Sequence, residues 1–529
     1  MTTEHELKDA YPAGQGIAQA AGIIALGNVA SRILGLVRET VIADLFGATG
    51  LVSAFNIASI VPKMIYELLI GGMVTAAMVP VFSDYASPER RRELWRLASA
   101  MFSLAVIAFS LLVLLLEFVA PQIAWILGGG FDAALQAQAT ALIRIILPSL
   151  VFFGLSGIAT GLLYSLKDFT YPAFGAAIFN VGIIISSLLF ARSLGIASLS
   201  FGVLLGSILQ MAIQLPGLRR VHLTFSLNLS HPGLYRIIQL YIPVILSLVI
   251  SQVGIAIDRN LASRTGEQTI AWMAAATTLI QFPLGLVSMA ISMAVLPSLS
   301  QFDVSAELEG FKQTLALGLR LVLVLIIPAA VGLLVLGKPI IALIFEHGEF
   351  TAYDTAQTAL ALRFYLLGLP FAAIDLPLIF AFYARKDTRT PVMVGILGVI
   401  IYLIVALATI HPLGMVGLVL ANSAQLTGHA LIMLVLLYRR LEGVSGYHLL
   451  GTTLKALLAS AAMGFAAYPV LVWLGGMVDA STLLGEVAMV GGTGVAGLVT
   501  YAAMISLLGV EEAKLIWEVI WTRLRGAAA

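Results

Sequence analysis

The sequence predicts an all-α polytopic membrane protein of about 14 transmembrane helices, in which two parallel six-helix lobes are followed by two further helices. Three observations support this fold class. Of the 529 residues, 60% are hydrophobic and only 11% are charged, and the mean hydropathy is +1.01. Apolar runs of about 20 residues, long enough to cross the hydrocarbon core of a bilayer, recur along almost the whole chain. The first part of the chain also resembles the second in sequence.

Polar segments and glycine or proline breaks set the limits of the expected spans. The spans cover residues 17–46, 51–82, 94–119, 134–165, 172–192, 196–217, 234–262, 267–300, 311–336, 353–383, 390–410, 413–438, 449–475 and 481–508. Residues 1–16 are polar and lack the basic-then-apolar pattern of a signal peptide, so we expect a short tail there. Residues 510–529 alternate apolar and charged positions and are expected to form a cytoplasmic amphipathic helix.

An internal repeat relates the first six spans to the next six. Residues 130–148 align with 349–367, and residues 164–172 align with 383–391, each pair at a separation of 219 residues. Because six spans return the chain to its starting side of the membrane, the two copies have the same orientation. Parallel repeats of this kind occur in transporters whose halves rock about a central site.

The repeat also indicates the domain limits. A further match joins residues 78–83 to residues 295–300, at a separation of 217. We therefore expect an N-lobe over residues 1–232 and a C-lobe over residues 233–445. Spans 13 and 14, within residues 446–509, lie outside the repeat.

The distribution of lysine and arginine predicts the orientation of the chain. If the N-terminus is cytoplasmic, fifteen Lys or Arg residues lie in or beside the cytoplasmic connections and three in the outward ones. Positive charge is concentrated on the cytoplasmic side of membrane proteins. Both termini are therefore expected in the cytoplasm.

Charged residues inside the first span are the leading site candidates. Arg32 and Arg38 lie six residues apart with Gly35 between them, and Glu39 follows directly. A charged side chain within a span is costly unless it has a partner or faces a watery cavity. We interpret Arg32 and Arg38 as lining one cavity, with Gly35 allowing a bend or a close approach. The alternative is that Glu39 neutralises Arg38.

Two other spans carry charged pairs. Lys63 and Glu67 in span 2 are separated by four residues and therefore lie on one helix face. This pair is interpreted either as self-neutralising or as a ligand site. Asp258 and Arg259 stand near the end of span 7, where a cavity role and a structural role remain equally open.

Several function classes are disfavoured by what the sequence lacks. There are no cysteines, which removes thiolate chemistry and Cys-based metal sites. The seven histidines show no metal-ligand spacing, and no Walker A loop is present. With a formal charge of +1, no basic field favours nucleic acid. No cofactor, no metal and no catalytic residue is predicted.

Several stretches together resemble the MurJ/MviN family, the lipid II flippases of the MOP transporter superfamily. The first is SRILGLVRETVIADLFG, at the end of span 1. The others are AMVPVFSDY, LLYSLKDFTYPAF, ISQVGIAIDRNLAS, QFPLGLVSMAISMAVLPSLS, FEHGEFTAYDT and FYARKDTRTPV. They occur in order over nearly the whole chain.

The resemblance implies a flippase that moves the undecaprenyl-diphosphate-linked peptidoglycan precursor (lipid II) between leaflets by alternating access. N-lobe arginines would receive the diphosphate and the sugar headgroup, and spans 13 and 14 would form a groove for the lipid tail. Arg32 and Arg38 occupy the positions of the family's arginines in span 1. Arginine suits this role because it binds phosphate through two parallel hydrogen bonds.

The residues and the resemblance together give the following site prediction. The diphosphate and headgroup would contact four cationic residues, namely Arg32, Arg38, Lys63 and Arg259. Gating or ion coupling would involve Glu39, Glu67, Asp258 and Gly35. The expected drive is the membrane potential or a monovalent cation.

The chain departs from the family pattern at several positions. Tyr66 and Glu67 stand where relatives have an Arg-Arg pair, and Ser53 replaces an acidic residue. Thr277 and Thr278 stand where relatives have Asp-Arg, and Gln281 replaces a glutamate. The departures keep a second cargo open, namely another polyprenyl-linked glycan of the capsule or O-antigen type.

Three further alternatives are weaker. A cation-coupled small-molecule exporter would not explain the cationic first lobe or spans 13 and 14. An intramembrane glycosyltransferase should show catalytic carboxylates beside a large outward loop, and a pure scaffold leaves the charges in the spans unexplained. We expect a transporter in the bacterial cytoplasmic membrane whose partners are its lipid-linked substrate and membrane lipids. A monomer is expected, and association with the cell-wall synthesis machinery is left open.

Overall fold

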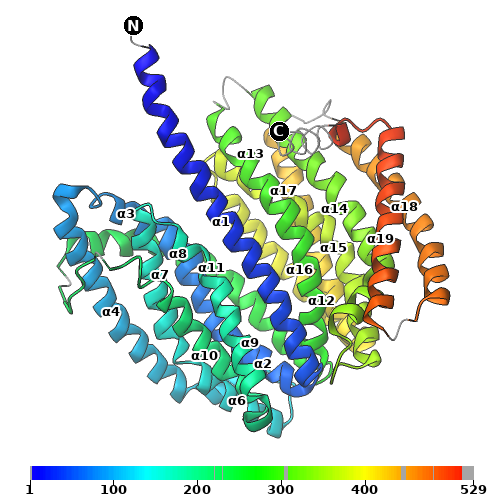
Figure 1. The fold of residues 1–529 in the computed structure, drawn as a ribbon, viewed down its shortest axis with the longest axis horizontal. Helices are drawn as coiled ribbons and strands as arrows, with labels where there is room; N and C mark the ends of the chain where they lie inside the picture. The colour runs from blue at the N-terminus through cyan, green and yellow to red at the C-terminus, as the bar shows by residue number, and fades with distance from the viewer. Residues whose placement is uncertain are drawn as a thin grey trace. The chain divides into compact units, whose positions relative to one another are not determined.

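A computed structural model describes residues 3–219, 221–228, 230–302, 308–441, 448–479 and 482–514 (Figure 1). Every regular element in these ranges is a helix, which confirms the predicted all-α fold class. Of the predicted amphipathic segment 510–529, the described part ends at Lys514 and is helical from Glu511; the rest lies outside the described residues.

The chain divides into two compact units, Met1–Ala271 and Trp272–Ala529. The first unit extends beyond residue 232, because the long helix after this point packs within it. The lobe limits that follow from the sequence repeat stay a prediction.

The first unit is built from helices that match the first seven expected spans. They are α1 (Thr3–Phe46), α2 (Gly50–Tyr66), η1 (Glu67–Met78), α3 (Val79–Ser83), η2 (Pro88–Arg90), α4 (Arg91–Phe118), α5 (Ala120–Leu127), α6 (Ala133–Ile146), α7 (Ser149–Ser165), α8 (Thr170–Ala173), α9 (Gly175–Leu194), α10 (Ala197–Ala212) and α11 (Pro232–Ser263). Residues 3–16, expected as a polar tail, continue α1 as helix.

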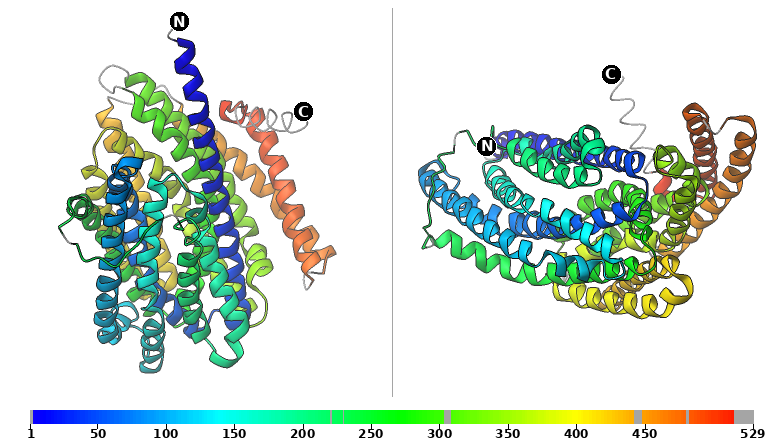
Figure 2. Two further views of the ribbon diagram at one scale, coloured as in Figure 1. Left: turned by 60° about the vertical axis from the view of Figure 1, so that its left-hand side comes forward. Right: turned by 90° about the horizontal axis from the view of Figure 1, so that it is seen from below.

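Small residues let the helices of the first unit approach closely. Helix α1 runs along α9, and α9 packs along α10 (Figure 2). A Cβ atom added to Gly182 of α9 would lie 2.4 Å from the Cα atom of Gly206 in α10. Glycine therefore sets this helix spacing, as small residues do in membrane bundles. A separate apolar core, which includes Phe82, Leu97 and Leu162, joins α3, α4 and α7.

The second unit begins within α12 and matches the remaining spans. Its helices are α12 (Thr269–Pro283), η3 (Leu284–Ser288), α13 (Met289–Gln301), α14 (Leu308–Phe345), α15 (Ala352–Ala384), α16 (Arg389–Leu413), α17 (Met415–Arg440), α18 (Leu449–Met477) and α19 (Leu483–Leu507).

The last two spans form a hairpin that packs on α14. The hydroxyl of Tyr501 in α19 donates to the carbonyl of Val324, with an O···O distance of 2.5 Å. Beyond α19, Glu512 forms an ion pair with Arg320 of α14, at 2.8 Å between Oε1 and Nε. This end of the second unit is therefore held by polar contacts as well as by apolar packing.

Within the described ranges, nine helices are long and apolar enough to cross a membrane. The number is ten if α6 and α7, which meet at 41°, count as one bent span. Shorter apolar helices cover Gly50–Tyr66, Gly72–Ser83 and Ala197–Ala212. The chain is thus a multi-pass membrane protein, and the count of 14 spans stays a prediction.

The repeat is visible in the backbone. Two π-helical segments, η1 and η3, begin at Glu67 and Leu284, which are 217 positions apart. Gly195 and Gly414 are 219 positions apart, and each has a φ of 55° at the turn between two spans. Such positive φ values favour glycine because it has no Cβ atom.

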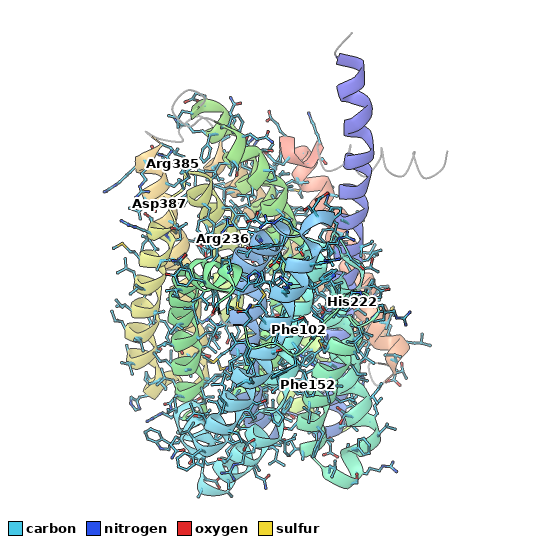
Figure 3. All side chains as sticks on the ribbon, turned by 90° about the vertical axis from the view of Figure 1, so that its left-hand side faces the viewer. Phe102, Phe152, His222, Arg236, Arg385 and Asp387 are labelled. Atoms are coloured by element: carbon cyan, nitrogen blue, oxygen red, sulfur yellow. The ribbon has the colours of Figure 1, made fainter. Side chains whose placement is uncertain are left out.

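A tight turn joins α15 to α16, and Arg385 and Asp387 lie on it (Figure 3). The Asp387 carboxylate accepts hydrogen bonds from the Thr390 hydroxyl at 2.6 Å and from the Arg440 guanidinium. Although partial burial acts in the opposite direction, these bonds from Thr390 and Arg440 hold the pKa of Asp387 below its ordinary value. The turn is thereby tied to the end of α17.

Candidate functional site

Arg38 on α1 is held by two neighbours. Its Nη1 atom donates to Oδ1 of Asn180 in α9 at 2.9 Å, and its Nη2 atom donates to the Glu39 carboxylate. The Arg38 and Glu39 side chains are 27% and 22% exposed. The pairing of Glu39 with Arg38, weighed as an alternative above, is therefore what the structure contains. Because the guanidinium has five N–H donors, these two contacts leave others available.

Asn180 is the central residue of this group and is absent from the sequence-based site. It is 5% exposed, and its Nδ2 atom donates to the carbonyls of Ser31 and Ala176, each at 3.1 Å. The amide thus bonds α1 to α9 while its oxygen faces Arg38. One signal could have found it, since Asn180 is the sole amide side chain in the apolar run 175–194.

Gly35 lies beside Asn180 without a close approach that requires glycine, and it does not interrupt α1. The helix is continuous from Thr3 to Phe46. A Cβ atom on Gly35 would lie 3.7 Å from Nδ2 of Asn180, which is ordinary contact. Arg32 is half-buried on the same helix, about 9 Å from Arg38 along the axis. The predicted roles of Gly35 in gating and of Arg32 in binding stay predictions.

Glu67 has a partner on another helix. Its Oε2 atom accepts a hydrogen bond from Nε2 of Gln252 in α11 at 3.2 Å, and Gln252 is 5% exposed. Lys63 is exposed, and in the described part of the chain it forms no ion pair with Glu67. The glutamate bonds to α11 instead, and the role of the Lys63–Glu67 pair stays a prediction.

Tyr66 is integrated into the packing of the first unit. Its hydroxyl accepts a hydrogen bond from Nε2 of Gln210 in α10 at 3.4 Å. Its ring meets Phe153 of α7 edge-on at a centroid distance of 5.1 Å, and Phe153 in turn contacts Phe179 of α9 at 5.5 Å. Where the family pattern has an arginine, this chain has an aromatic contact between α2, α7 and α9.

A buried polar network continues from Tyr66 and Gln210 of α10 to Gln214 in the turn after this helix. Nε2 of Gln214 donates to the Ser156 hydroxyl at 2.6 Å and to the Gln210 carbonyl at 3.3 Å. The Thr160 hydroxyl donates to Oε1 of Gln214 at 3.1 Å. Sequence reasoning did not single out these amides, because their pairing depends on how α7 and α10 face each other.

Asp258 and Arg259 lie near the end of α11, which is anchored to the turn between α5 and α6. The two side chains are 20% and 22% exposed, with their closest N and O atoms 4.0 Å apart. Nδ2 of the next residue, Asn260, donates to the Ile126 carbonyl at 2.7 Å. The hydroxyl of Ser263 accepts from the Gly130 amide at 2.9 Å.

The predicted site residues thus form separate groups. Arg38 and Gly35 lie against Asn180 of α9, and Glu39 pairs with Arg38, whereas Glu67 bonds to Gln252 of α11. Among the contacts of the described residues, none joins Arg38 to Lys63 or Arg259. In the second unit, the Thr278 hydroxyl donates to the Ala274 carbonyl of its own helix at 3.0 Å. No three His, Asp or Glu side chains come together as a metal site within the described ranges.

The comparison with known proteins gives one consistent result. Residues 42–484 match the family model described as "Lipid II flippase MurJ". A curated lipid II flippase MurJ from Burkholderia cenocepacia is 33% identical over 384 residues, which cover 70% of this chain and 74% of the relative. A probable lipid II flippase MurJ from Vibrio cholerae is 30% identical over 512 residues, covering 92% of this chain and 95% of the relative.

Solved structures are similar in the same way. A structure described as lipid II flippase MurJ in an inward closed conformation is 26% identical, with a TM-score of 0.75 and coverage of 92% of this chain and 98% of that one. An inward-facing MATE-family transporter of the MOP superfamily is 13% identical, with a TM-score of 0.66 over 78% of this chain and 95% of that one. The second similarity concerns the fold alone.

Proposed function

The chain belongs to the MurJ family of lipid II flippases, and we propose that it moves lipid II from the inner to the outer leaflet of the bacterial cytoplasmic membrane. The observation that carries this proposal is the Arg38 group on α1. A guanidinium inside a predicted span is fixed by Asn180 and Glu39 while other N–H groups remain for a ligand.

The first step of the proposed mechanism is recognition of the diphosphate. Asn180 and Glu39 fix the plane of the Arg38 guanidinium, so that less side-chain entropy is lost when a phosphate binds. Arg32 lies six residues before Arg38 on the same helix and adds a second positive charge. Lys63, which is exposed, and Arg259 are proposed to contact the headgroup from α2 and α11.

The second step is exchange of the Arg38 partner. Without substrate, Glu39 balances the charge of Arg38, which lowers the cost of keeping both groups within a span. A bound diphosphate would replace part of this balance and leave Glu39 to interact elsewhere. Rocking of the two lobes would then expose the headgroup outside while the polyprenyl tail stays in lipid.

Coupling and surroundings belong to the same proposal. Glu39, Glu67, Asp258 and Gly35 are proposed to couple the cycle to the membrane potential or to a monovalent cation. The bias of lysine and arginine supports cytoplasmic termini. We further propose that the protein is a transporter without catalytic residues, acts as a monomer and meets the cell-wall synthesis machinery in the membrane.

The decisive experiment is headgroup-resolved flipping in proteoliposomes. Arg38→Ala should lower the initial rate of lipid II flipping by about 10- to 100-fold, the size expected for lost hydrogen bonds to a charged group. Arg38→Lys should restore only part of the rate, because lysine lacks the forked geometry. The matched control is Arg96→Ala, since Arg96 is 70% exposed and pairs with Glu93. A correctly inserted Arg38→Ala protein with the wild-type rate would contradict the proposal.

A second cargo is kept open by one observation. Tyr66 replaces a family arginine and is fully engaged by Phe153 and Gln210. The same liposomes should therefore be loaded with another polyprenyl-diphosphate glycan. Faster flipping of that lipid than of lipid II would favour a flippase of the capsule or O-antigen type.

A further inference from the structure

The second unit contains a histidine–carboxylate pair that the site above does not use. Nδ1 of His429 in α17 lies 2.6 Å from Oδ1 of Asp375 in α15. The two side chains are 13% and 19% exposed, so most of their surface is removed from solvent. A contact this short between an imidazole and a carboxylate is typical of a hydrogen bond with charge on at least one partner.

The backbone of α16 forms another side of the pair. The ring of His429 interacts with the carbonyl of Pro391 at the start of α16. Further along this helix, a Cβ atom added to Gly398 would lie 3.8 Å from Cδ2 of His429. Gly398 of α16 therefore lies beside the ring, at a spacing that would also admit a methyl group.

The ring thus faces two acceptors. The Asp375 carboxylate oxygen is hydrogen-bonded to Nδ1, and the Pro391 carbonyl is a further acceptor near the ring, since proline has no backbone N–H to donate. A neutral imidazole has one N–H group, whereas the imidazolium has two. Only the protonated ring can donate a separate N–H group to each oxygen. The acceptors beside His429 therefore suit an imidazole ring that can bind a second proton.

Other charged groups on α15 and α17 are remote from the pair along the helix axes, whereas α16 carries one near its start. On α15 and α17, the nearest ones toward the α15–α16 turn are Arg385 and Arg439, each ten residues away, or about 15 Å. On α16, the exposed Arg389 is two residues before Pro391, or about 3 Å along the axis, and is the nearest charged residue of that helix to the ring; His411 is thirteen residues after Gly398, or about 20 Å. On the α16 face that Gly398 occupies, the next titratable group is Tyr402, one turn further on.

The remaining neighbours are helices that pack on α15. Helix α13 and η3 carry no charged side chain. Helix α14 carries Glu309, Lys312, Arg320 and Lys338. Lys312 binds Glu309, and Arg320 binds Glu512. On α15 itself, Arg363 lies twelve residues before Asp375, or about 18 Å, and Asp354 lies still further away.

We propose that Asp375 and His429 form a proton-binding site in the second unit, and that proton uptake and release change how α15 packs against α17 during transport. The bound species is one proton on the imidazole. Without it, the pair carries the single negative charge of Asp375; with it, the pair is a neutral imidazolium–carboxylate. A change of one charge within an apolar helix bundle alters the balance between packing arrangements.

Proton binding can be measured without any transport assay. The full chain has seven histidines, so histidine-selective isotope labelling in lipid nanodiscs gives a small set of ring resonances. The resonance lost in His429→Gln should titrate between about pH 5 and 8 in the wild-type protein, the range in which histidine commonly changes charge. Asp375→Asn should move its midpoint by at least about one pH unit, since a carboxylate partner is lost.

Two results of the titration would overturn the proposal. A His429 resonance that stays in one protonation state across the whole range would exclude a proton-binding site. A titration that is the same in Asp375→Asn would show that the two side chains do not act together. If His429→Gln fails to fold, Asp375→Asn and wild-type protein still decide this outcome.

The link to transport rests on the proposed function and is tested separately. Initial flipping rates in proteoliposomes should vary by about threefold or more between pH 5.5 and 8 in the wild type, and this variation should be lost in His429→Gln. The matched control is His411→Gln, because His411 is exposed near the end of α16 and should keep the pH profile. An unchanged profile in His429→Gln would overturn coupling, whereas failure of the wild type to flip any lipid would overturn the proposed function alone.

Discussion

Lys167 and Lys386 stand 219 positions apart, and both have left-handed backbone conformations, with φ values of 62° and 59°. Each lysine precedes an aspartate whose amide donates to a carbonyl five residues earlier, Asp168 to Leu163 at 2.9 Å and Asp387 to Phe382 at 3.0 Å. The sequence repeat is therefore also a repeat of turn geometry. In both copies a lysine adopts a backbone conformation that most side chains disfavour.

This strained position gives a test of the turn. Lys386→Val should destabilise the purified protein by about 1–2 kcal/mol, because a β-branched residue in the left-handed region meets its own backbone. Lys386→Asn removes the same charge but tolerates this conformation, so it should stay close to wild type. Thermal unfolding in one detergent compares the two variants. Equal melting temperatures would show that the turn is not fixed in this conformation.

Asn180 is predicted to act through Arg38. Asn180→Ala should lower the flipping rate by about tenfold, because the guanidinium loses a partner that sets its orientation. Ser187→Ala on the same helix is the control, since the Ser187 hydroxyl donates to the Ile183 carbonyl of its own helix. If the loss in Asn180→Ala were merely structural, raising the lipid II concentration would not restore the rate. A positioning role instead predicts a higher half-saturating concentration.

The two glycine contacts of α9 should respond in opposite ways. Gly35→Ala introduces an ordinary 3.7 Å contact and should be neutral or stabilising by up to about 1 kcal/mol, because alanine favours helix. Gly182→Ala introduces a 2.4 Å contact with α10 and should destabilise by about 1–3 kcal/mol. Both are measured by thermal unfolding. Should Gly35→Ala flip lipid II at the wild-type rate, its predicted gating role would be lost.

The ion pair between Glu512 and Arg320 is expected to hold the end of the α18–α19 hairpin. Glu512→Ala should destabilise the second unit by about 3 kcal/mol, the lower end for a broken buried pair. The lower end applies because the Nε and Oε1 atoms of this pair, although close, do not meet in hydrogen-bond geometry. Glu511→Ala, at the exposed neighbouring position, should have little effect. Equal unfolding of the two variants by denaturant would rule out this role.

The fold was predictable because its determinants are local. Apolar length fixes where spans lie, and turn residues such as Lys386 and Gly414 mark the repeat. The site was only partly predictable, since the partners of Arg38 and Glu67 lie on other helices. Asn180 and Gln252 become partners through the rotation and register of α9 and α11. No periodicity in one segment contains that information.

The same limit explains the departures from the family pattern. Tyr66 looked like the loss of a cationic ligand, yet it fills space between Phe153 and Gln210. Whether a replaced residue leaves a gap or a contact depends on its neighbours in space. Only the packed structure shows which of the two occurs at Tyr66.

The π-helical segments at Glu67 and Leu284 have a mechanical consequence. A π-turn closes its hydrogen bond over one more residue than an α-turn. Tightening one such turn to α geometry therefore rotates everything beyond it by about 100° about the helix axis. The span that ends in α3 and the span that ends in α13 each contain such a π-helical segment at equivalent positions of the repeat. Either helix can show a different side to its surroundings while its loops and its length in sequence stay the same.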